Sequence, residues 1–271
     1  MTPQARALPF HATRAPEWAT EWGDDEYGLH AAFVVGGVRH RLRWVPPGRF
    51  RMGSPPSEPM RSDDEPLHEV ELTQGYWLGE TTCTRALWEV VMGNNPSRFQ
   101  EGSDTGERPV GRVSWEDCQV FLQRINELVP GLALRLPTEA EWERACRAGT
   151  ETPFSFGENI RPEQVNYEGN YPYAGGEKGE YRKRTVAVRS LPANGWGFYE
   201  MHGNVWEWCE DWYGSYEPGP VVDPRGPEQG GSRLLRGGSW YDVARRARSA
   251  IRSHGRPGGR DGYVGFRLAR G

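Results

Sequence analysis

The fold is decided by residues 134–149, which read LRLPTEAEWERACRAG. Thr138 and Glu141 have the spacing of a capping box, in which each side chain accepts a hydrogen bond from the other residue's backbone N–H. Gly149 follows the last apolar position, and glycine ends many helices because it adopts a positive φ freely. The stretch therefore predicts a helix that begins after Thr138 and stops before Gly149.

Two further helices are predicted closer to the N-terminus, over TRALWEVVMG (84–93) and SWEDCQVFLQRINEL (114–128). Thr84 and Ser114 are residue types that cap a helix N-terminus, and Gly93 is a stop signal. The apolar positions of the second segment recur with helical spacing and indicate a buried face. They are positions 118, 121, 122, 125 and 128.

The rest of the chain reads as loops and short strands, two of them joined at Gly36–Gly37. Gly (35) and Pro (22) make up about a fifth of the 271 residues, which argues against a helical bundle because both residues break helices. The 12 Trp, 11 Tyr and 9 Phe exclude a fully disordered chain and indicate an aromatic core. We expect an N-terminal arm or extension over residues 1–40 and one α+β domain over residues 41–271.

The chain carries no apolar run near the ~18–20 residues that a membrane-spanning helix needs. Its first residues, MTPQARALPFHATRAPEW, lack the apolar segment of a secretory signal. The four cysteines lie far apart without a CxxC pair, which is typical of reduced core residues. These observations predict a cytoplasmic protein without a membrane partner. The cysteines are Cys83, Cys118, Cys146 and Cys209.

The charge is divided unevenly along the chain. Residues 232–271 contain ten arginines, no lysine and two aspartates, a net charge of +8. The net charge of the whole chain is −4, so the remainder carries −12. A basic segment of this kind can bind nucleic acid. We favour the alternative that these arginines fold back onto the acidic body, because LLRGGSW and VGFRLA in the same segment are typical of a core.

Five segments resemble the formylglycine-generating enzyme family, whose fold is C-type-lectin-like. The resemblance implies one irregular α+β domain with little regular secondary structure, from about residue 40 onward. The family includes copper-dependent oxidases of sulfatase cysteines, iron-dependent sulfoxide synthases and non-catalytic ligand-binding proteins. The segments are PPGRFRMGS (46–54), LRLPTEAEWERACRAG (134–149), GNVWEW (203–208), LRGGSW (235–240) and VGFR (264–267).

The catalytic residues of these enzymes have no counterpart here. The oxidases carry two cysteines after the RGGS motif, and this chain has Asp242 and Ala247 at about those places. A cuprous ion needs thiolate or thioether ligands, which neither residue supplies. The iron-dependent members take histidines from an additional N-terminal domain, and the six histidines here show no HxH or HxxxH spacing. We therefore expect neither copper nor iron and assign no catalytic residue.

The resemblance also implies a structural calcium at residues 200–207, because the family's oxidases bind one at the matching motif. Oxygen ligands of this kind suit calcium, although the family usually has Asn where Glu200 stands. A second family calcium site falls near Asn166 and Glu180. The alternative is that these side chains cap turns and pair with arginines. The ligands carried over to the first site are Glu200, Gly203, Val205 and Glu207.

The segment 233–267 resembles more closely the variable proteins of diversity-generating retroelements, which share this fold. In those proteins an error-prone reverse transcriptase randomises adenines, mostly in Asn codons, between fixed framework positions. The framework residues expected to be buried or hydrogen-bonded include Arg236, Trp240, Arg248, Arg252 and Phe266. The twelve variable positions, expected to form one ligand-binding face, are Tyr241, Asp242, Val243, Arg246, Ile251, Ser253, His254, Gly255, Gly259, Asp261, Gly262 and Tyr263.

The genetic code offers a test of these positions. An AAC codon with both adenines randomised becomes NNC, which cannot encode Trp, Met, Lys, Glu or Gln. All twelve residues are encodable by NNC, and none of the five excluded types occurs between 241 and 263. A Gly- and Arg-rich loop that lacks those types by composition is the alternative.

Two classes of function follow from these patterns. The first is a non-enzymatic module that displays the variable positions on a C-type lectin scaffold and binds a ligand, which we expect to be a protein and not nucleic acid. The second is a formylglycine-generating-enzyme-like paralogue with altered oxidoreductase chemistry. A regulatory or effector subunit of a prokaryotic conflict system with an ATPase partner is compatible with the first.

Overall fold

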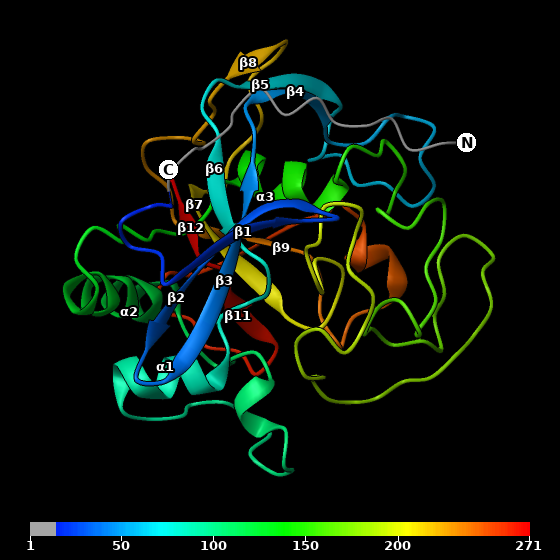
Figure 1. The fold of residues 1–271 in the computed structure, drawn as a ribbon. Coiled ribbons are helices and arrows are strands. Elements are labelled where there is room, and N and C mark those ends of the chain that lie inside the picture. Colours follow the sequence, from blue (N-terminus) through cyan, green and yellow to red (C-terminus); the bar gives the residue numbers. More distant parts are fainter. Residues whose placement is uncertain (1–14) are drawn as a thin grey trace.

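The computed structural model describes residues 15–271, which form three β-sheets and three short α-helices (Figure 1). The strands are β1 (Glu21–Asp25), β2 (Gly28–Val35), β3 (Val38–Val45), β4 (Gly48–Met52), β5 (His68–Leu72), β6 (Tyr76–Gly79), β7 (Trp206–Trp212), β8 (Val221–Val222), β9 (Arg233–Arg236), β10 (Arg252–Gly255), β11 (Val264–Phe266) and β12 (Ala269–Arg270). An antiparallel sheet runs in the order β1-β2-β3-β6-β12, and a second has the order β10-β9-β7-β11 with β11 parallel to β7. The third sheet is β4-β5-β8.

The helices begin at the predicted caps. They are α1 (Arg85–Met92), α2 (Trp115–Leu128) and α3 (Glu139–Arg147), with 3-10 helices η1 (Thr105–Glu107) and η2 (Ala244–Ala247). Ser114 and Thr138 each form a capping box, with Asp117 and Glu141 as the reciprocal partners. Thr84 accepts a hydrogen bond from the backbone N–H of Leu87 at the start of α1. Among the described residues, no α-helix follows α3, and none is long and apolar enough to cross a membrane.

Aromatic rings make up much of the core, as the composition predicts. The ring of Trp88 stacks on Phe121 at 5.4 Å between centroids, and Phe266 meets Phe121 edge-on at 5.3 Å. All four cysteines are free and buried. Leu128 was expected on the buried face of α2 but is 57% exposed, because it lies in the last turn of the helix, beyond the contact of Ile125 with the core.

Residues before position 40 are part of the main sheet. β1 pairs with β2, β2 pairs with β3, and Ala31 and Phe33 of β2 are completely buried. Gly36 and Gly37 form the predicted turn between β2 and β3, both with positive φ. The expected boundary at residue 40 therefore falls inside β3, and the described part of the expected arm continues the sheet. Residues 1–14 of that arm lie outside the described residues.

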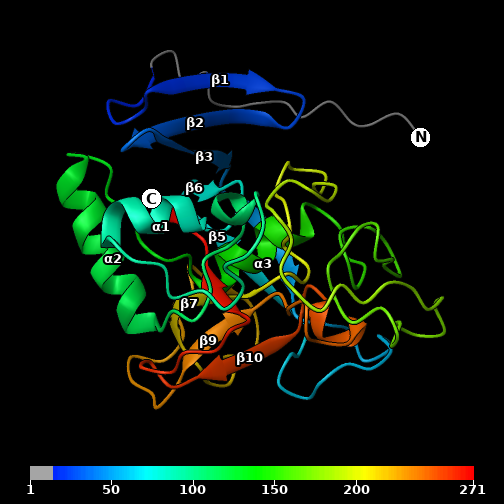
Figure 2. The same ribbon diagram turned by 90° about the horizontal axis from the view of Figure 1, so that it is seen from below.

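The two larger sheets lie at opposite ends of the molecule. Seen from below, β1 and β2 form one end and β9 and β10 the other, with the helices between them (Figure 2). β10, which carries some of the predicted variable positions, therefore lies at the end of the molecule that faces away from β1.

Candidate ligand-binding site

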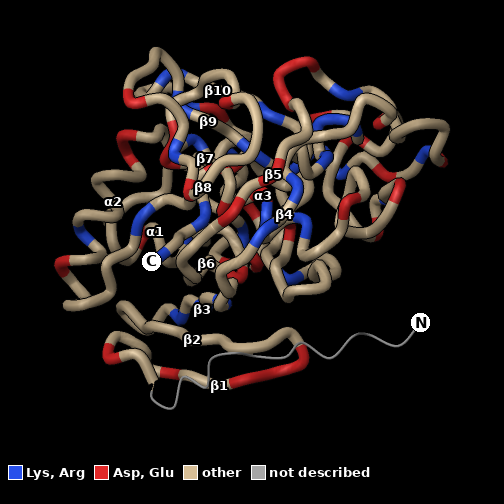
Figure 3. The backbone as a smooth tube through the Cα atoms, turned by 90° about the horizontal axis from the view of Figure 1, so that it is seen from above, with Lys and Arg blue, Asp and Glu red and all other residues tan. Residues whose placement is uncertain are grey.

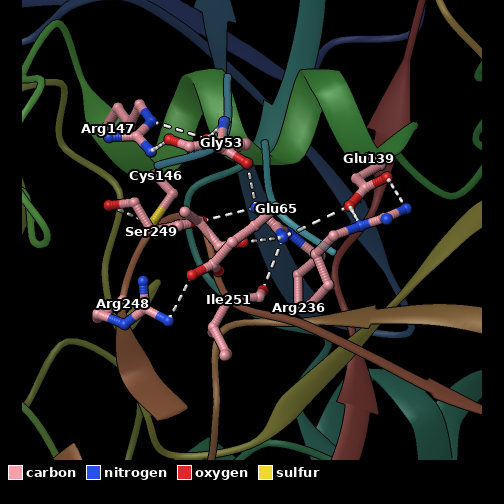
Figure 4. A network of polar contacts seen from close by, with 12 residues as sticks. Gly53, Glu65, Glu139, Cys146, Arg147, Arg236, Arg248, Ser249 and Ile251 are labelled. Carbon is pink, nitrogen blue, oxygen red and sulfur yellow. Dashed lines mark hydrogen bonds and ion pairs between the residues drawn. The ribbon is translucent and has the colours of Figure 1, made fainter. Parts of the chain in front are cut away.

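A buried guanidinium fixes the backbone on which several variable positions lie. Arg236, at the end of β9, has no exposed surface. Its Nη1 donates to the carbonyls of Ala250 (2.9 Å) and Ile251 (2.6 Å), and its Nη2 donates to the carbonyl of Ser249 (2.6 Å) and to the carboxylate of Glu143 (Figure 4). The segment that leads into β10 is thereby held by one side chain.

Glu143, on α3, is the buried counter-charge of this arrangement. It accepts hydrogen bonds from the backbone N–H of Gly53 and from Nε of Arg147, both at 2.8 Å. Burial alone would raise the pKa of Glu143, but Arg147 and Arg236 hold that pKa below its ordinary value. The carboxylate therefore stays ionised between two guanidinium groups.

Two more framework arginines pair with buried acids of the body. Arg252 forms a bidentate pair with Glu139 at 2.7 and 3.0 Å. Arg248 lies 2.6 Å from a carboxylate oxygen of Glu58 and 2.7 Å from one of Glu65. Basic and acidic residues interleave around α3, β9 and β10 (Figure 3). The expectation that the basic segment folds onto the acidic body is confirmed, and so is the burial of Arg236, Trp240, Arg248, Arg252 and Phe266.

A cleft of about 710 Å³ lies over this framework, between β7, β9, β10 and the 256–264 segment. Trp206 and Trp208 of β7 both line it, since residues two apart in a strand face the same side. At its rim the rings of Tyr241 and Tyr263 stack at 6.0 Å with 12° between their planes. Tyr241 is 58% exposed, and burial raises the pKa of the more enclosed Tyr263.

Asp242 is tied to the framework although it lines the cleft. Its Oδ2 accepts hydrogen bonds from Nε1 of Trp206 (2.9 Å) and Oγ of Ser239 (2.5 Å). Its Oδ1 accepts from Nε of Arg246 (3.4 Å), whose guanidinium lies 5.1 Å from the centroid of the Trp206 ring. A substitution at position 242 therefore changes the support of Trp206 as well as the surface of the cleft.

The structure brings nine of the twelve predicted variable positions together as lining residues of this one cleft, although they are spread over residues 241–263. The nine are Tyr241, Asp242, Arg246, Ser253, His254, Gly255, Gly259, Asp261 and Tyr263.

The remaining three positions lie elsewhere. Ile251 was expected to be exposed, and this is wrong: it is 2% exposed and packs in the main core, because the carbonyl bonds to Arg236 turn the strand entry inward. Val243 is half-buried at the start of η2 and does not line the cleft. Gly262 lies behind the rim, where a Cβ would be 3.1 Å from Cδ of Arg98.

Gly255 lines the cleft but has little room for a side chain. A Cβ at this position would lie 2.8 Å from the ring of Trp208, so any other residue requires that ring to move. Of the nine lining positions, this one tolerates replacement only with rearrangement of the floor.

Seven lining residues were not predicted. Those on strands come from the GNVWEW, LLRGGSW and VGFR motifs, where alternation along a strand was the available signal. The others lie beside predicted positions in the 256–264 segment, and only the folded structure shows that they line the same cleft. They are Trp206, Trp208, Leu235, Arg256, Gly258, Arg260 and Val264.

Ala247, which stands at about the place of an oxidase cysteine, is completely buried. Its carbonyl accepts a hydrogen bond from Nδ1 of His202 (2.7 Å), and Nε2 of that ring lies 3.6 Å from Sγ of Cys146. Burial raises the pKa of Cys146 to about 12 and lowers the pKa of His202 to about 4. This thiol and imidazole are therefore both neutral at pH 7 and enclosed, which is the state of structural and not of reactive cysteines.

The residues at 200–207 do not fit a calcium ion. Both carboxylate oxygens of Glu207 are taken: Oε2 accepts from Nε1 of Trp142 (2.7 Å) and Nε of Arg267 (2.9 Å), and Oε1 from Nη2 of Arg267 (2.8 Å). A cation there would face the Arg267 guanidinium. Oε2 of Glu200 accepts a hydrogen bond from the backbone N–H of Arg189 (3.3 Å), and burial raises the pKa of this carboxyl to about 7.

The second expected calcium site is divided between separate partners. Nδ2 of Asn166 donates to the carbonyl of Arg184 (3.0 Å) and to Oδ1 of Asn204 (3.1 Å). Glu180 is exposed and pairs with Arg182 at 3.2 Å. Within residues 15–271, no three His, Cys, Asp or Glu side chains are grouped so as to hold a metal.

Known proteins are similar to this chain in sequence and in fold. The serine/threonine-protein kinase pkn1 of Chlamydia caviae is 32% identical over 250 residues, 83% of this chain and 37% of that protein. The formylglycine-generating enzyme of Streptomyces coelicolor is 37% identical over 171 residues, 59% of this chain and 52% of the enzyme. The chain thus spans about half or less of the length of these relatives.

A solved structure matches over most of both chains. It is Treponema denticola variable protein 1, with a TM-score of 0.72 and 29% identity over 89% of this chain and 98% of that one. The sulfatase-modifying factor enzyme 1-like domain matches residues 38–271. The sequence motifs, the irregular α+β fold and this match lead to one conclusion: the chain belongs to the sulfatase-modifying factor enzyme 1-like family.

Proposed function

We propose that this protein is a non-enzymatic ligand-binding module in which a retroelement diversifies the surface of the cleft. The observation that carries the proposal is the convergence of nine of the twelve variable positions on one 710 Å³ cleft. The positions taken from the resemblance to variable proteins therefore lie mostly on one surface, as a diversified binding site requires.

The surroundings of the cleft suit such a role. Tyr241 and Tyr263 offer rigid aromatic area, and Ser253, His254 and Asp261 offer adaptable polar groups, the combination found in antibody paratopes. The buried arginine pairs beneath them use framework side chains only, so most lining residues can change without loss of these pairs. A protein ligand with a protruding segment fits an open cleft of this size.

The likeness to Treponema denticola variable protein 1 supports this proposal over an enzymatic one. The formylglycine-generating enzymes among the relatives favour the alternative of an oxidoreductase. Against that alternative, Asp242 and Ala247 supply no thiolate for copper, and Asp242 is engaged by Trp206 and Ser239.

The binding role is tested with two double variants. Tyr241→Ala/Tyr263→Ala removes the ring stack, and Leu128→Ala/Val222→Ala removes two exposed apolar side chains that do not line the cleft. In affinity purification from the source cells, at least one protein should bind to the wild type and to the control variant but not to the cleft variant. The same set of proteins on all three chains contradicts the proposal.

The diversification is tested on the DNA that flanks the gene. We expect a near-repeat of the codons for residues 233–267 with adenines at the variable codons, beside a reverse transcriptase gene. A repeat with adenines at the framework codons, or no repeat, contradicts the retroelement but leaves ligand binding to the preceding test.

A further inference from the structure

A basic patch lies next to the cleft, formed by Arg98, Arg182, Lys183 and Arg184. Two segments that are distant in sequence, 98–101 and 182–184, enclose a hollow of about 450 Å³ there. Arg98 and Lys183 are exposed, and Lys183 has a φ of 59°, a conformation that costs energy for a residue with a side chain. None of these four residues is a variable position, so the patch is a fixed feature of the protein.

The positive charge of the basic patch is only partly neutralised. Arg182 pairs with Glu180 at 3.2 Å, and Glu101 is the other acid at the hollow. In the described chain, no carboxylate pairs with Arg98, Lys183 or Arg184. The Nη2 of Arg184 donates to the carbonyl of Glu101 (3.2 Å), and its buried Nε has no hydrogen-bond partner among the described residues.

A further cation stands behind the patch and forms no ion pair with a carboxylate of the described residues. Arg85 is 1% exposed and donates only to neutral oxygens: the carbonyls of Phe99 and Pro109 and the hydroxyl of Thr185. Burial, and then the neighbouring Arg108 and Arg184, lower its pKa to about 10. The framework arginines Arg236, Arg248 and Arg252 each pair with a buried carboxylate, so Arg85 differs from them in this respect.

Aromatic rings hold these cations in place. The guanidinium of Arg98 lies 5.4 Å from the ring centroid of Phe99 and 5.9 Å from that of Trp240, and Arg184 lies 5.8 Å from Phe99. Nζ of Lys183 lies 5.9 Å from the ring of Tyr181. Such contacts orient a cation without neutralising it. Because Trp240 is 3% exposed and cations cover the other rings, few ring faces are free to stack on bases, so carboxylates fit this patch better than a nucleic acid does.

The basic patch and the cleft share an edge. The rings of Trp240 and Tyr241 lie 5.4 Å apart, and Tyr241 lines the cleft while Trp240 supports Arg98. A Cβ on Gly262, beside the rim residue Tyr263, would meet Arg98 at 3.1 Å. A ligand larger than the cleft therefore extends over the patch.

We propose that the basic patch binds an acidic segment of the polypeptide ligand, with Asp or Glu carboxylates on the guanidinium groups of Arg98 and Arg184 and the ammonium group of Lys183. The inference rests on the proposed function, because it takes the ligand of the cleft to be a protein. The patch supplies constant electrostatic attraction, and the variable positions select among the ligands that this attraction brings to the cleft.

The experiment measures fluorescence anisotropy of a labelled oligoglutamate peptide against the full chain. The patch variants are Arg98→Gln/Lys183→Gln and Arg98→Glu/Lys183→Glu, and the control is Arg161→Glu/Arg225→Glu, which reverses two exposed cations elsewhere. We expect saturable binding that weakens with salt, a loss of about tenfold or more in the charge-reversed patch variant, a smaller loss in the neutral variant, and a control within about twofold of the wild type.

Three results would overturn this inference: no saturable binding at low salt, equal losses in patch and control variants, or tighter binding of an oligodeoxythymidylate than of the peptide. The melting temperatures of all variants establish that each is folded. Tyr241→Ala/Tyr263→Ala should bind the oligoglutamate like the wild type. The two proposals can therefore fail separately. If the Tyr241→Ala/Tyr263→Ala variant loses the cellular partner and the wild type does not bind oligoglutamate, the patch proposal is rejected and the cleft proposal stands.

Discussion

Glu143 shows how one residue determines the support of the binding surface. Its carboxylate has no exposed surface and joins Arg147 of its own helix to Arg236 of β9. A buried pair is not in itself strongly stabilising, since both charges lose their hydration, but removal of one partner leaves the other charge buried and uncompensated. The burial of guanidinium groups under the cleft therefore depends on this acid.

We predict that Glu143→Gln lowers the free energy of unfolding by about 3–5 kcal/mol, as for other broken buried pairs. The control is Glu151→Gln, because the Glu151 side chain is 68% exposed and its ion pair with Arg51 is loose at 3.3 Å. That change should stay within about 0.5 kcal/mol. Urea denaturation measures the free energy of unfolding of both variants. If Glu143→Gln lowers it no more than Glu151→Gln does, the Arg236 guanidinium finds another partner.

Ile251 and Tyr241 provide a second comparison at single positions. Ile251→Ala should cost about 2–5 kcal/mol because it leaves a cavity in the main core. Tyr241→Ala, at a side chain that is 58% exposed, should change stability by less than about 0.5 kcal/mol. Thermal melting of the two variants distinguishes them, and a near-neutral Ile251→Ala would mean that position 251 is free to vary after all.

Asp211 gives the protein a pH dependence. Burial, together with the Glu139 carboxylate, raises the pKa of Asp211 to about 8. The folded state thus holds a proton that the unfolded chain releases above about pH 4, so this stability is present below that pH and is lost as the pH rises through about 8.

Between about pH 7 and 8, the free energy of unfolding should change less favourably with pH in the wild type than in Asp211→Asn, by up to about 1.4 kcal/mol per pH unit. Burial lowers the pKa of His40 to about 3 and of His202 to about 4, so both take up protons on unfolding and oppose this slope, but they do so equally in the two proteins. Urea denaturation at several pH values measures the difference. Parallel profiles of wild type and variant would place the proton on another group.

At the scale of the element, the helices depend on their caps because each is short. α2 begins at Ser114, whose Oγ accepts from the N–H of Asp117 (3.0 Å) while the Asp117 carboxylate accepts from the N–H of Ser114 (2.9 Å). The same carboxylate pairs with Arg260 of the segment that borders the cleft, at 2.6 and 2.7 Å. One cap therefore starts a helix and anchors a binding loop.

Ser114→Ala should lower the free energy of unfolding by about 0.5–2 kcal/mol through loss of the cap. Ser215→Ala, at an exposed serine outside any helix, serves as the control and should be near neutral. Thermal melting is the measurement. If both variants melt like the wild type, water replaces the cap and the helix does not depend on it.

The elements were predictable wherever the signal was local. Thr84, Ser114 and Thr138 marked the helix starts, and Gly36–Gly37 marked a turn. Contacts between distant residues left no such signal: the pairing of β12 with β6, the pairing of Arg267 with Glu207, and the inward turn of Ile251 all depend on the closed fold. The cleft was predicted in part: the resemblance to variable proteins pointed to nine of its lining residues, whereas Trp206 and Trp208 come from a distant strand that only the closed fold brings to the cleft.

At the scale of the whole molecule, the main sheet joins early and late parts of the chain. β12 pairs with β6, which pairs with β3, and Leu268 packs in the same core as Phe33. No division of the described residues into two independent halves leaves this sheet intact.

Thermal unfolding should therefore show one cooperative transition with coincident midpoints by tryptophan fluorescence and far-ultraviolet circular dichroism. The tryptophans report on both large sheets, since Trp44 and Trp77 lie in one and Trp206 and Trp208 in the other. Two separate midpoints would indicate that the sheets unfold independently.

The late position of the framework arginines matters during synthesis on the ribosome. A nascent chain that has emerged only as far as residue 232 contains the acids of the interior but, of the guanidinium groups that pair with them, it lacks all four that the last segment supplies. Such a chain cannot bury those acids as ions, so it stays open and accessible to proteases. A chain cut short in this segment is therefore expected to be degraded by the cell, so that the framework screens each chain for completeness. The pairs on which this screening depends join Arg236, Arg248, Arg252 and Arg267 to Glu143, Glu58, Glu65, Glu139 and Glu207.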